Sequence, residues 1–295
     1  MNKHSTTDQS YKRTQNTNQI KLWGHLQQAQ QQGATQILSF GGAWSNHLHA
    51  LAAVGKALNI KTIGVVRGLV SESSKYKLSA TLKDCQAFGM TLLFVSRQDY
   101  LLKHLAPPVQ LLLNKDAATY VVPEGGGGAK GSLFCHALIK SIEDSVPIST
   151  TICMPCGTGT TLAGMVRSAS TNVQLLGVSA LKSTVIDTLS DRPPLYRDVQ
   201  SQLPIDCHVN WDIRFDHHCG GYAKVTDELI DFMQEFTAET GVLLDPIYTG
   251  KMMLAIAKLV KQNYWQAGDS VAAIHTGGLQ GRRGFNVLQK QELTS

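Results

Sequence analysis

Short apolar runs alternate with amphipathic segments along most of this chain, and this alternation constrains the fold more than any other feature. The apolar runs predict buried strands at 35–40, 61–66, 91–95, 119–122, 151–154, 173–178 and 270–274. Apolar residues at helical spacing predict helices at 20–32, 46–58, 98–113 and 227–239, with further helices beginning near residues 74, 131 and 161. Strands that alternate with helices are joined by right-handed crossovers, so the pattern predicts an α/β fold with largely parallel sheets.

The length of 295 residues allows one large domain or two modest ones, and we expect two that share a cleft. Residues 191–204 are proline-rich and weakly patterned, so they are expected to form a loop. In open parallel sheets, ligands bind beyond the carboxyl ends of the strands. A binding site is therefore expected in the loops that follow the predicted strands.

Composition and charge argue against several classes of function. The net charge is only +5, and the 27 basic residues are scattered, which argues against a nucleic-acid partner and suits a small anionic ligand. No apolar run approaches the roughly 20 residues of a membrane span. Residues 1–30 are polar and rich in glutamine, unlike a signal peptide, and the six irregularly spaced cysteines are typical of reduced thiols. We therefore expect a cytoplasmic protein without a membrane partner.

Four glycine-containing loops each follow a predicted strand. They read GGAWSNH at 41–47, EGGGG at 124–128, CGTGTT at 156–161 and HTGG at 275–278. Glycine lets the backbone approach a ligand closely, and exposed amides at the start of a helix attract anions. One such loop is more often a structural turn than a site, but four at strand ends predict a binding cleft. The loop at 157–161 is the best phosphate candidate, because it offers both amides and hydroxyls.

Nucleotide, metal and hydrolase motifs fail on spacing. The third glycine of the dinucleotide fingerprint is replaced by Leu162, and residues 129–131 lack the Gly-Lys-Ser/Thr of nucleotide hydrolases. Cys153 and Cys156 have the spacing of a redox or metal pair, but no second pair accompanies them, so a strand position is favoured. Ser45 lies outside a Gly-x-Ser-x-Gly motif. Neighbouring histidines lack further ligands at suitable spacing, and no metal site is expected at His47, His49, His217 or His218.

Four segments stand out together: SFGGAWSNHLHA at 39–50, GTGTT at 157–161, LDPIYTGK at 244–251 and HTGG at 275–278. In sequence, order and spacing they resemble the family of pyridoxal-phosphate (PLP) enzymes that contains 1-aminocyclopropane-1-carboxylate deaminase and D-cysteine desulfhydrase. The resemblance runs from about residue 12 to about residue 278. The Gly-Gly-x-x-Ser-Asn-His element is specific among PLP enzymes of the tryptophan-synthase-like fold.

The resemblance implies roles for individual residues. Asn46 is expected to hydrogen-bond the phenolic oxygen of PLP, and Thr276 to lie near its pyridine nitrogen. Ser45 is expected to face the substrate, and Tyr248 to reach the substrate side, where a phenol can act in proton transfer. The phosphate of PLP is expected to bind the loop formed by Gly157, Thr158, Gly159, Thr160 and Thr161.

The sequence departs from the family at the lysine that forms the Schiff base with PLP. The family carries Gly-Asn-Lys-x-x-Lys-Leu, whereas residues 17–22 of this chain read TNQIKL. Asn18 takes the place of the first lysine, and an amide cannot form an imine. Three interpretations stay open: Lys21, almost one helical turn away, replaces the missing lysine; the chain binds PLP without catalysis; or it is a shortened, decayed copy. The family's leading segment is not seen in this sequence, which favours the last two somewhat.

The resemblance also implies an overall fold and reaction. We expect two open parallel-sheet domains with PLP in the cleft between them, the smaller formed by residues 33–123 and the larger by residues 1–32 and 124–295. An active protein would deaminate a small amino acid of the 1-aminocyclopropane-1-carboxylate or D-cysteine type and release ammonia and a 2-oxo acid. Homodimers are common in the family, but the sequence does not show the oligomeric state.

Overall fold

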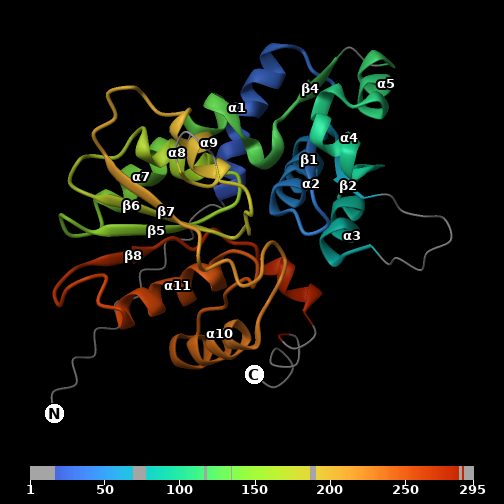
Figure 1. Cartoon of the computed structure of the whole chain (residues 1–295). Coiled ribbons are helices and arrows are strands. Elements are labelled where there is room, and N and C mark those ends of the chain that lie inside the picture. The colour runs from blue at the N-terminus through green and yellow to red at the C-terminus, as the bar shows by residue number, and fades with distance from the viewer. Residues whose placement is uncertain are drawn as a thin grey trace.

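Two parallel sheets form the centres of two lobes (Figure 1). The structure is a computed structural model, and it describes residues 17–68, 78–115, 118–133, 135–186, 191–285 and 288. The first sheet has the strand order β3-β2-β1-β4 and the second the order β7-β6-β5-β8, with every pairing parallel. Each sheet thus places its earliest strand in the interior and winds outward in both directions, which gives it a topological switch point.

The strands of both sheets are short and largely buried. Residues in β1 and β5 are all buried, as expected for parallel strands that are covered on both faces. The first sheet consists of β1 (Gln36–Gly41), β2 (Lys61–Arg67), β3 (Thr91–Val95) and β4 (Thr119–Val121). The second consists of β5 (Thr151–Cys156), β6 (Gln174–Ser179), β7 (Asn210–Arg214) and β8 (Val271–Ala273).

Helices cover both sheets. Those that follow strands of the first sheet are α2 (Asn46–Leu58), α3 (Ala80–Ala87), α4 (Arg97–Leu102), η1 (Lys103–Leu105) and α5 (Pro107–Lys115). The second lobe contains α7 (Cys135–Glu143), α8 (Thr160–Val166), α9 (Pro194–Gln200), α10 (Asp227–Thr240) and α11 (Thr249–Lys261). The elements around the boundary between the lobes are α1 (Thr17–Gln31), η2 (Glu124–Gly126), α6 (Gly128–Leu133) and η3 (Leu279–Gly284).

Helix α1 connects the two lobes through packing. Its buried residues Leu22, Leu26 and Ala29 join the apolar cluster that lies between the first sheet and α2. On another side α1 contacts α6, which in turn packs on α8 of the second lobe. A residue on α1 can therefore face the boundary between the lobes.

Most of the predicted elements are confirmed, and several are wrong. The predicted helix at 98–113 is divided at Ala106, which is extended because Pro107 follows it. The expected loop at 191–204 contains α9, where Pro194 occupies the first turn, a position that needs no backbone donor. Strand β7 and helix α11 were not predicted. The helix expected to begin near residue 74 starts at Ala80, and residues 69–77 lie outside the described part.

The two sheets are built by residues 36–121 and 151–273, consistent with two α/β units. The division at residues 33 and 123 stays a prediction. Within the described ranges, none of the helices has the length and apolar character that a membrane crossing requires.

Candidate active site between the two sheets

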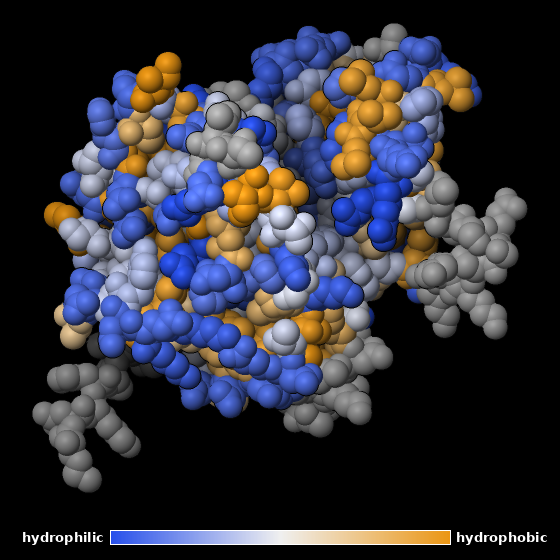
Figure 2. Space-filling view, viewed as in Figure 1, coloured by the Kyte–Doolittle hydropathy of each residue, from blue (hydrophilic) through white to orange (hydrophobic). Residues whose placement is uncertain are grey.

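A cavity of about 360 Å³ lies where the strands of both sheets end. Its walls include residues at or just beyond the carboxyl ends of β1, β2, β5 and β8, and others from α1, α4 and η2. Figure 2 shows the surface hollowed between the two lobes. This is the edge at which parallel α/β sheets bind ligands.

All ten side chains or backbone positions predicted as site residues line this one cavity. Before folding they are spread over most of the chain, from α1 to the end of β8. They are Lys21, Ser45, Asn46, Gly157, Thr158, Gly159, Thr160, Thr161, Tyr248 and Thr276.

The loop at 157–161 connects β5 with α8 and is shaped by its glycines. Gly159 has a φ of 72°, in the left-handed region, and a Cβ at this position would clash with the side chain of Val199. The hydroxyl oxygens of Thr158 and Thr160 lie 3.1 Å apart. Across the cavity, a Cβ on Gly125 would come within 2.6 Å of the Thr158 hydroxyl, so two glycine loops approach each other here. Amides and hydroxyls of this kind suit an anionic group.

Asn46 is buried at the start of α2 and has a fixed orientation. Its Oδ1 accepts a hydrogen bond of 2.6 Å from Gln280 Nε2, and its side chain lies beside Gly278, where a Cβ would come within 2.5 Å of Nδ2. Because Gln280 occupies the amide oxygen, Nδ2 is left as a donor toward the cavity. Gln280 was not predicted; it lies in η3, two positions beyond the HTGG segment.

Lys21 extends from α1 into the cavity and is only 7 % exposed. Burial lowers the pKa of its amine, because the ammonium loses its hydration, and the thiols of Cys135 and Cys156 oppose this shift. A buried amine with a lowered pKa holds a larger neutral, nucleophilic fraction than a surface lysine does. The side chain of Asn18 lies outside the described part.

His47 lies beside Lys21 and carries an unsatisfied polar atom. Burial, with a smaller contribution from the Lys21 charge, lowers the pKa of His47 to about 3, so its ring is neutral at ordinary pH. Ser39 Oγ donates to the carbonyl of Val122 at 2.9 Å and therefore accepts from His47 Nε2, 2.7 Å away. This arrangement makes Nδ1 an acceptor, and it has no hydrogen-bond partner in the described part of the chain. This nitrogen is itself fully buried beside Gly126, so it is an unsatisfied acceptor behind the cavity surface.

Tyr248 is positioned by the turn that precedes α11. The fully buried carboxylate of Asp245 accepts hydrogen bonds from three successive backbone amides, those of residues 247–249. The Tyr248 ring lies edge-on to Tyr222, with ring centroids 6.2 Å apart. Burial raises the pKa of Tyr222 to about 12 and that of Tyr248 well above its usual value, so both are neutral phenols. Tyr222 was not predicted.

Ser45 and Thr276 complete the predicted set. Ser45 caps α2: its side-chain oxygen accepts from the backbone amide of Leu48 at 3.2 Å. Thr276 follows β8 and reaches the same cavity from the second sheet. The cavity therefore collects hydroxyl groups from both lobes.

Charged residues form the outer part of the cavity. Glu124 accepts from the Tyr100 hydroxyl at 2.6 Å and pairs with Lys103 at 2.7 Å. The Lys103 ammonium also lies 3.6 Å from the centre of the Tyr100 ring, and the guanidinium carbon of Arg67 lies 5.8 Å from it. Glu124 begins the predicted glycine loop at 124–128, whereas Tyr100, Lys103 and Arg67 were not predicted.

The cysteine pair that has the spacing of a redox or metal site forms part of a buried strand. Cys153 and Cys156 lie in β5, both buried as free thiols, and burial raises the pKa of each to about 12, which makes them poor nucleophiles. Among the described residues no three histidine, cysteine, aspartate or glutamate side chains gather into a metal site.

Comparisons with known proteins agree with this geometry. A putative 1-aminocyclopropane-1-carboxylate deaminase of Pyrococcus horikoshii is 26% identical over 267 residues, which cover 88% of this chain and 79% of that protein. The bifunctional D-cysteine desulfhydrase/1-aminocyclopropane-1-carboxylate deaminase of Arabidopsis thaliana is 27% identical over 278 residues, 88% of this chain and 68% of that one. The crystal structure of an ACC deaminase homologue superposes with a TM-score of 0.75 at 22% identity, over 93% of this chain and 84% of the other.

The family model described as pyridoxal-phosphate dependent enzyme matches residues 11–277, which is most of the chain and includes both sheets and the whole cavity. The two parallel sheets confirm the expected α/β architecture of this class. The chain therefore belongs to the family of pyridoxal-phosphate dependent enzymes, among the homologues of 1-aminocyclopropane-1-carboxylate deaminase and D-cysteine desulfhydrase.

Proposed function

We propose that this protein is a PLP-dependent lyase that deaminates a small amino acid of the 1-aminocyclopropane-1-carboxylate or D-cysteine type, releasing ammonia and a 2-oxo acid. One observation carries the proposal: residues predicted from four separate sequence segments, and Lys21 with them, line a single cavity at the carboxyl ends of two parallel sheets. The names of the relatives from Pyrococcus horikoshii and Arabidopsis thaliana support the choice of reaction.

The cavity fits PLP in charge and donor chemistry. The loop at 157–161 would hold the phosphate with its amides and hydroxyls, and the free Nδ2 of Asn46 would donate to the phenolic oxygen. Thr276 would lie near the pyridine nitrogen. When bound, PLP supplies an electron sink for a bond broken at the α-carbon of an amino acid.

Lys21 is the residue proposed to carry PLP covalently. It lines the cavity, is almost fully buried, and its lowered pKa makes the neutral amine more available than on the surface. The amide at position 18 cannot take this role. Lys103, the other lysine of the cavity, is paired with Glu124 and is therefore less available.

Ser45 and Tyr248 are proposed to act on the substrate. The first amides of α2, at Asn46 and His47, have no partner within the helix, and with the Ser45 hydroxyl they can bind the α-carboxylate of an amino acid. Tyr248, neutral because of burial, can donate a proton from its phenol to the substrate. Its ring packs edge-on against Tyr222, which also lines the cavity.

Borohydride reduction of the PLP-loaded protein tests the proposal. We expect reduced cofactor to be fixed on Lys21, as located by mass spectrometry of the peptide that spans 17–26. The Lys21→Met variant should lose this fixation, whereas Lys56→Met, which removes an exposed lysine of α2, should retain it. Cofactor that binds but is never fixed would favour the alternative, a catalytically impaired PLP-binding homologue. Absence of PLP binding would refute both.

A further inference from the structure

We propose that Arg67 makes the cavity selective for an amino acid whose side chain ends in a second anionic group, such as a carboxylate, sulfonate or phosphate. This inference rests on the proposed PLP-dependent deamination of a small amino acid and assigns it a different substrate class. Of the two substrate types considered above, the cyclopropane acid carries no second charge and D-cysteine carries one only as a thiolate. The proposal therefore predicts a preference that neither of those substrate types meets well.

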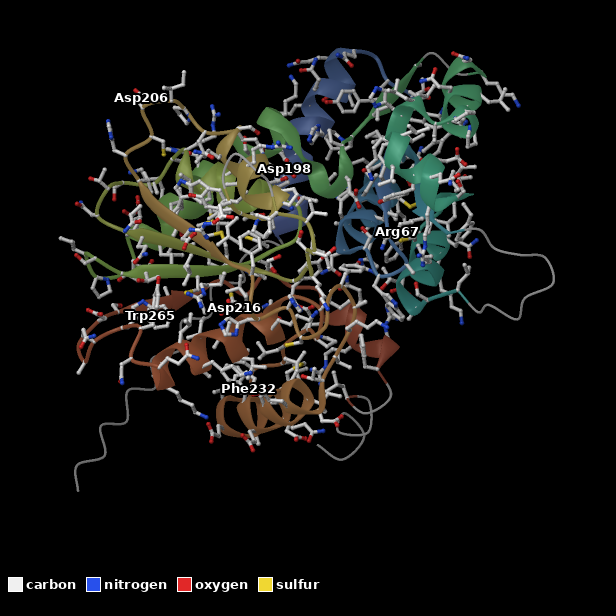
Figure 3. All side chains as sticks on the ribbon, in the orientation of Figure 1. Arg67, Asp198, Asp206, Asp216, Phe232 and Trp265 are labelled. Atoms are coloured by element: carbon white, nitrogen blue, oxygen red, sulfur yellow. The ribbon has the colours of Figure 1, made fainter. Side chains whose placement is uncertain are left out.

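Arg67 is the last residue of β2, so its side chain leaves the first sheet at the edge where ligands bind. It lines the cavity, in the lobe of the first sheet (Figure 3). A Cβ placed on Gly42 would lie 3.6 Å from the Tyr222 ring and 3.9 Å from Arg67 Nη2. Arg67 and Tyr222 therefore approach the same point of the glycine loop that precedes α2.

The charges that line the cavity leave Arg67 without a counter-ion. The charged residues are Lys21, Arg67, Lys103 and Glu124. The Glu124 carboxylate is occupied by the Lys103 ammonium at 2.7 Å and by the Tyr100 hydroxyl at 2.6 Å. Among the residues that the structure describes, no carboxylate pairs with Arg67; its recorded neighbours are the Tyr100 ring and Tyr222. Arg67 is exposed to solvent, so its guanidinium can exchange water for an anionic ligand in the cavity, and its planar geometry matches a carboxylate, sulfonate or phosphate.

A series of contacts connects Arg67 with the proposed cofactor loop on the other side of the cavity. A Cβ on Gly157, in the proposed phosphate loop, would lie 3.2 Å from the Tyr248 ring. Tyr248 contacts Tyr222, and Tyr222 in turn lies next to Arg67. Neighbouring side chains thus connect the proposed phosphate loop with Arg67 through Tyr248 and Tyr222. A substrate held by its amino group near the cofactor would extend its side chain toward the guanidinium.

The α-carboxylate has other donors, which is why Arg67 is assigned to the side chain. Ser45 and the first amides of α2 lie at the C-terminal end of the glycine loop, next to Asn46. If Arg67 bound the α-carboxylate instead, it would act equally on every amino acid. The two assignments therefore predict different responses to a change in the substrate's side chain alone.

Isothermal titration of the PLP-loaded protein with aspartate and asparagine, using both enantiomers of each, tests the inference. The two amino acids are nearly isosteric and differ by one charge. We expect aspartate to bind about tenfold more tightly than asparagine, in line with a charge-assisted hydrogen bond. In Arg67→Gln this difference should disappear through weaker binding of aspartate, with asparagine unchanged. Arg97→Gln removes an exposed arginine outside the cavity and should keep the wild-type difference.

Every other result of these titrations contradicts either the inference about Arg67 or the proposed function. Equal affinities in the wild type, or a loss of both affinities in Arg67→Gln, would overturn the inference, the second by assigning Arg67 to the α-carboxylate. A wild-type protein that binds no PLP, judged by the visible absorbance after dialysis, would overturn the proposed function and the inference together. Intact PLP absorbance with equal affinities would overturn the inference alone.

Discussion

Replacing Lys251 by methionine should remove a rise in stability that the wild-type protein gains between pH 8 and 10.5. Lys251 lies on α11, is fully buried, and donates from Nζ to the carbonyl of Gly221 at 2.6 Å. Burial lowers its pKa from 10.5 to about 8. Gly221 precedes Tyr222, so this lysine also fixes the segment that brings Tyr222 to the cavity.

The direction and size of the effect follow from proton linkage. Because the folded pKa lies below the unfolded one, the folded state binds fewer protons between pH 8 and 10.5, and the free energy of unfolding rises with pH across this window. Below pH 8 both the folded and the unfolded state carry the proton, so Lys251 no longer contributes to the pH dependence of the unfolding free energy. The displacement of the pKa corresponds to about 3 kcal/mol over the whole window.

Urea denaturation at several pH values from 7 to 11 measures this contribution. Cysteines and tyrosines also titrate there, so the informative quantity is the difference between wild type and Lys251→Met, in which these other groups cancel. We expect the difference to grow by about 3 kcal/mol in favour of the wild type between pH 8 and 10.5. Lys261→Met, an exposed position on the same helix, should follow the wild-type curve. If the unfolding free energies of wild type and Lys251→Met change with pH in parallel, Lys251 does not have the lowered pKa on which this prediction rests.

Three further outcomes are expected. Gly159→Ala should destabilise the fold by more than Gly268→Ala, because both have positive φ but only the first would press a Cβ against Val199, as thermal denaturation can show. His47 should stay neutral down to about pH 3, so that stability falls as pH drops below 6.5 toward that value; NMR titration of its ring measures this. Asn46→Asp should weaken PLP binding by at least about tenfold in a fluorescence titration, because a carboxylate would replace the amide donor.

The sequence predicted the sheets better than the helices that cover them. Fully buried parallel strands such as β1 appear as continuous apolar runs, which are easily recognised. Two proline pairs led to wrong predictions. Pro193 and Pro194 suggested a loop, but a helix, α9, begins there. Pro107 and Pro108 were placed inside one long helix, but they divide it. Strand β7 alternates polar and apolar residues over only five positions, too short a pattern to stand out.

The site was predictable where a loop carries a motif and unpredictable where single residues come from distant segments. Glycine loops at strand ends meet at one edge of a parallel sheet, which brought the predicted residues together. Tyr222 reaches the cavity through tertiary packing, and Gln280 orients Asn46 from behind it; neither belongs to one of the recognised segments. Arg67 ends an ordinary strand, and only the structure shows that it lacks a carboxylate partner among the described residues while lining the cavity.

A crystal structure of the protein grown with PLP tests the central claim most directly. The account predicts the cofactor in the cavity between the two sheets, its phosphate on the loop at 157–161, its phenolic oxygen within hydrogen-bond distance of Asn46 Nδ2, and continuous electron density to Lys21 Nζ. Density for PLP in this cavity that stops short of Lys21 would contradict the assignment of the lysine. PLP bound elsewhere, or an empty cavity at saturating PLP, would contradict the proposed site itself.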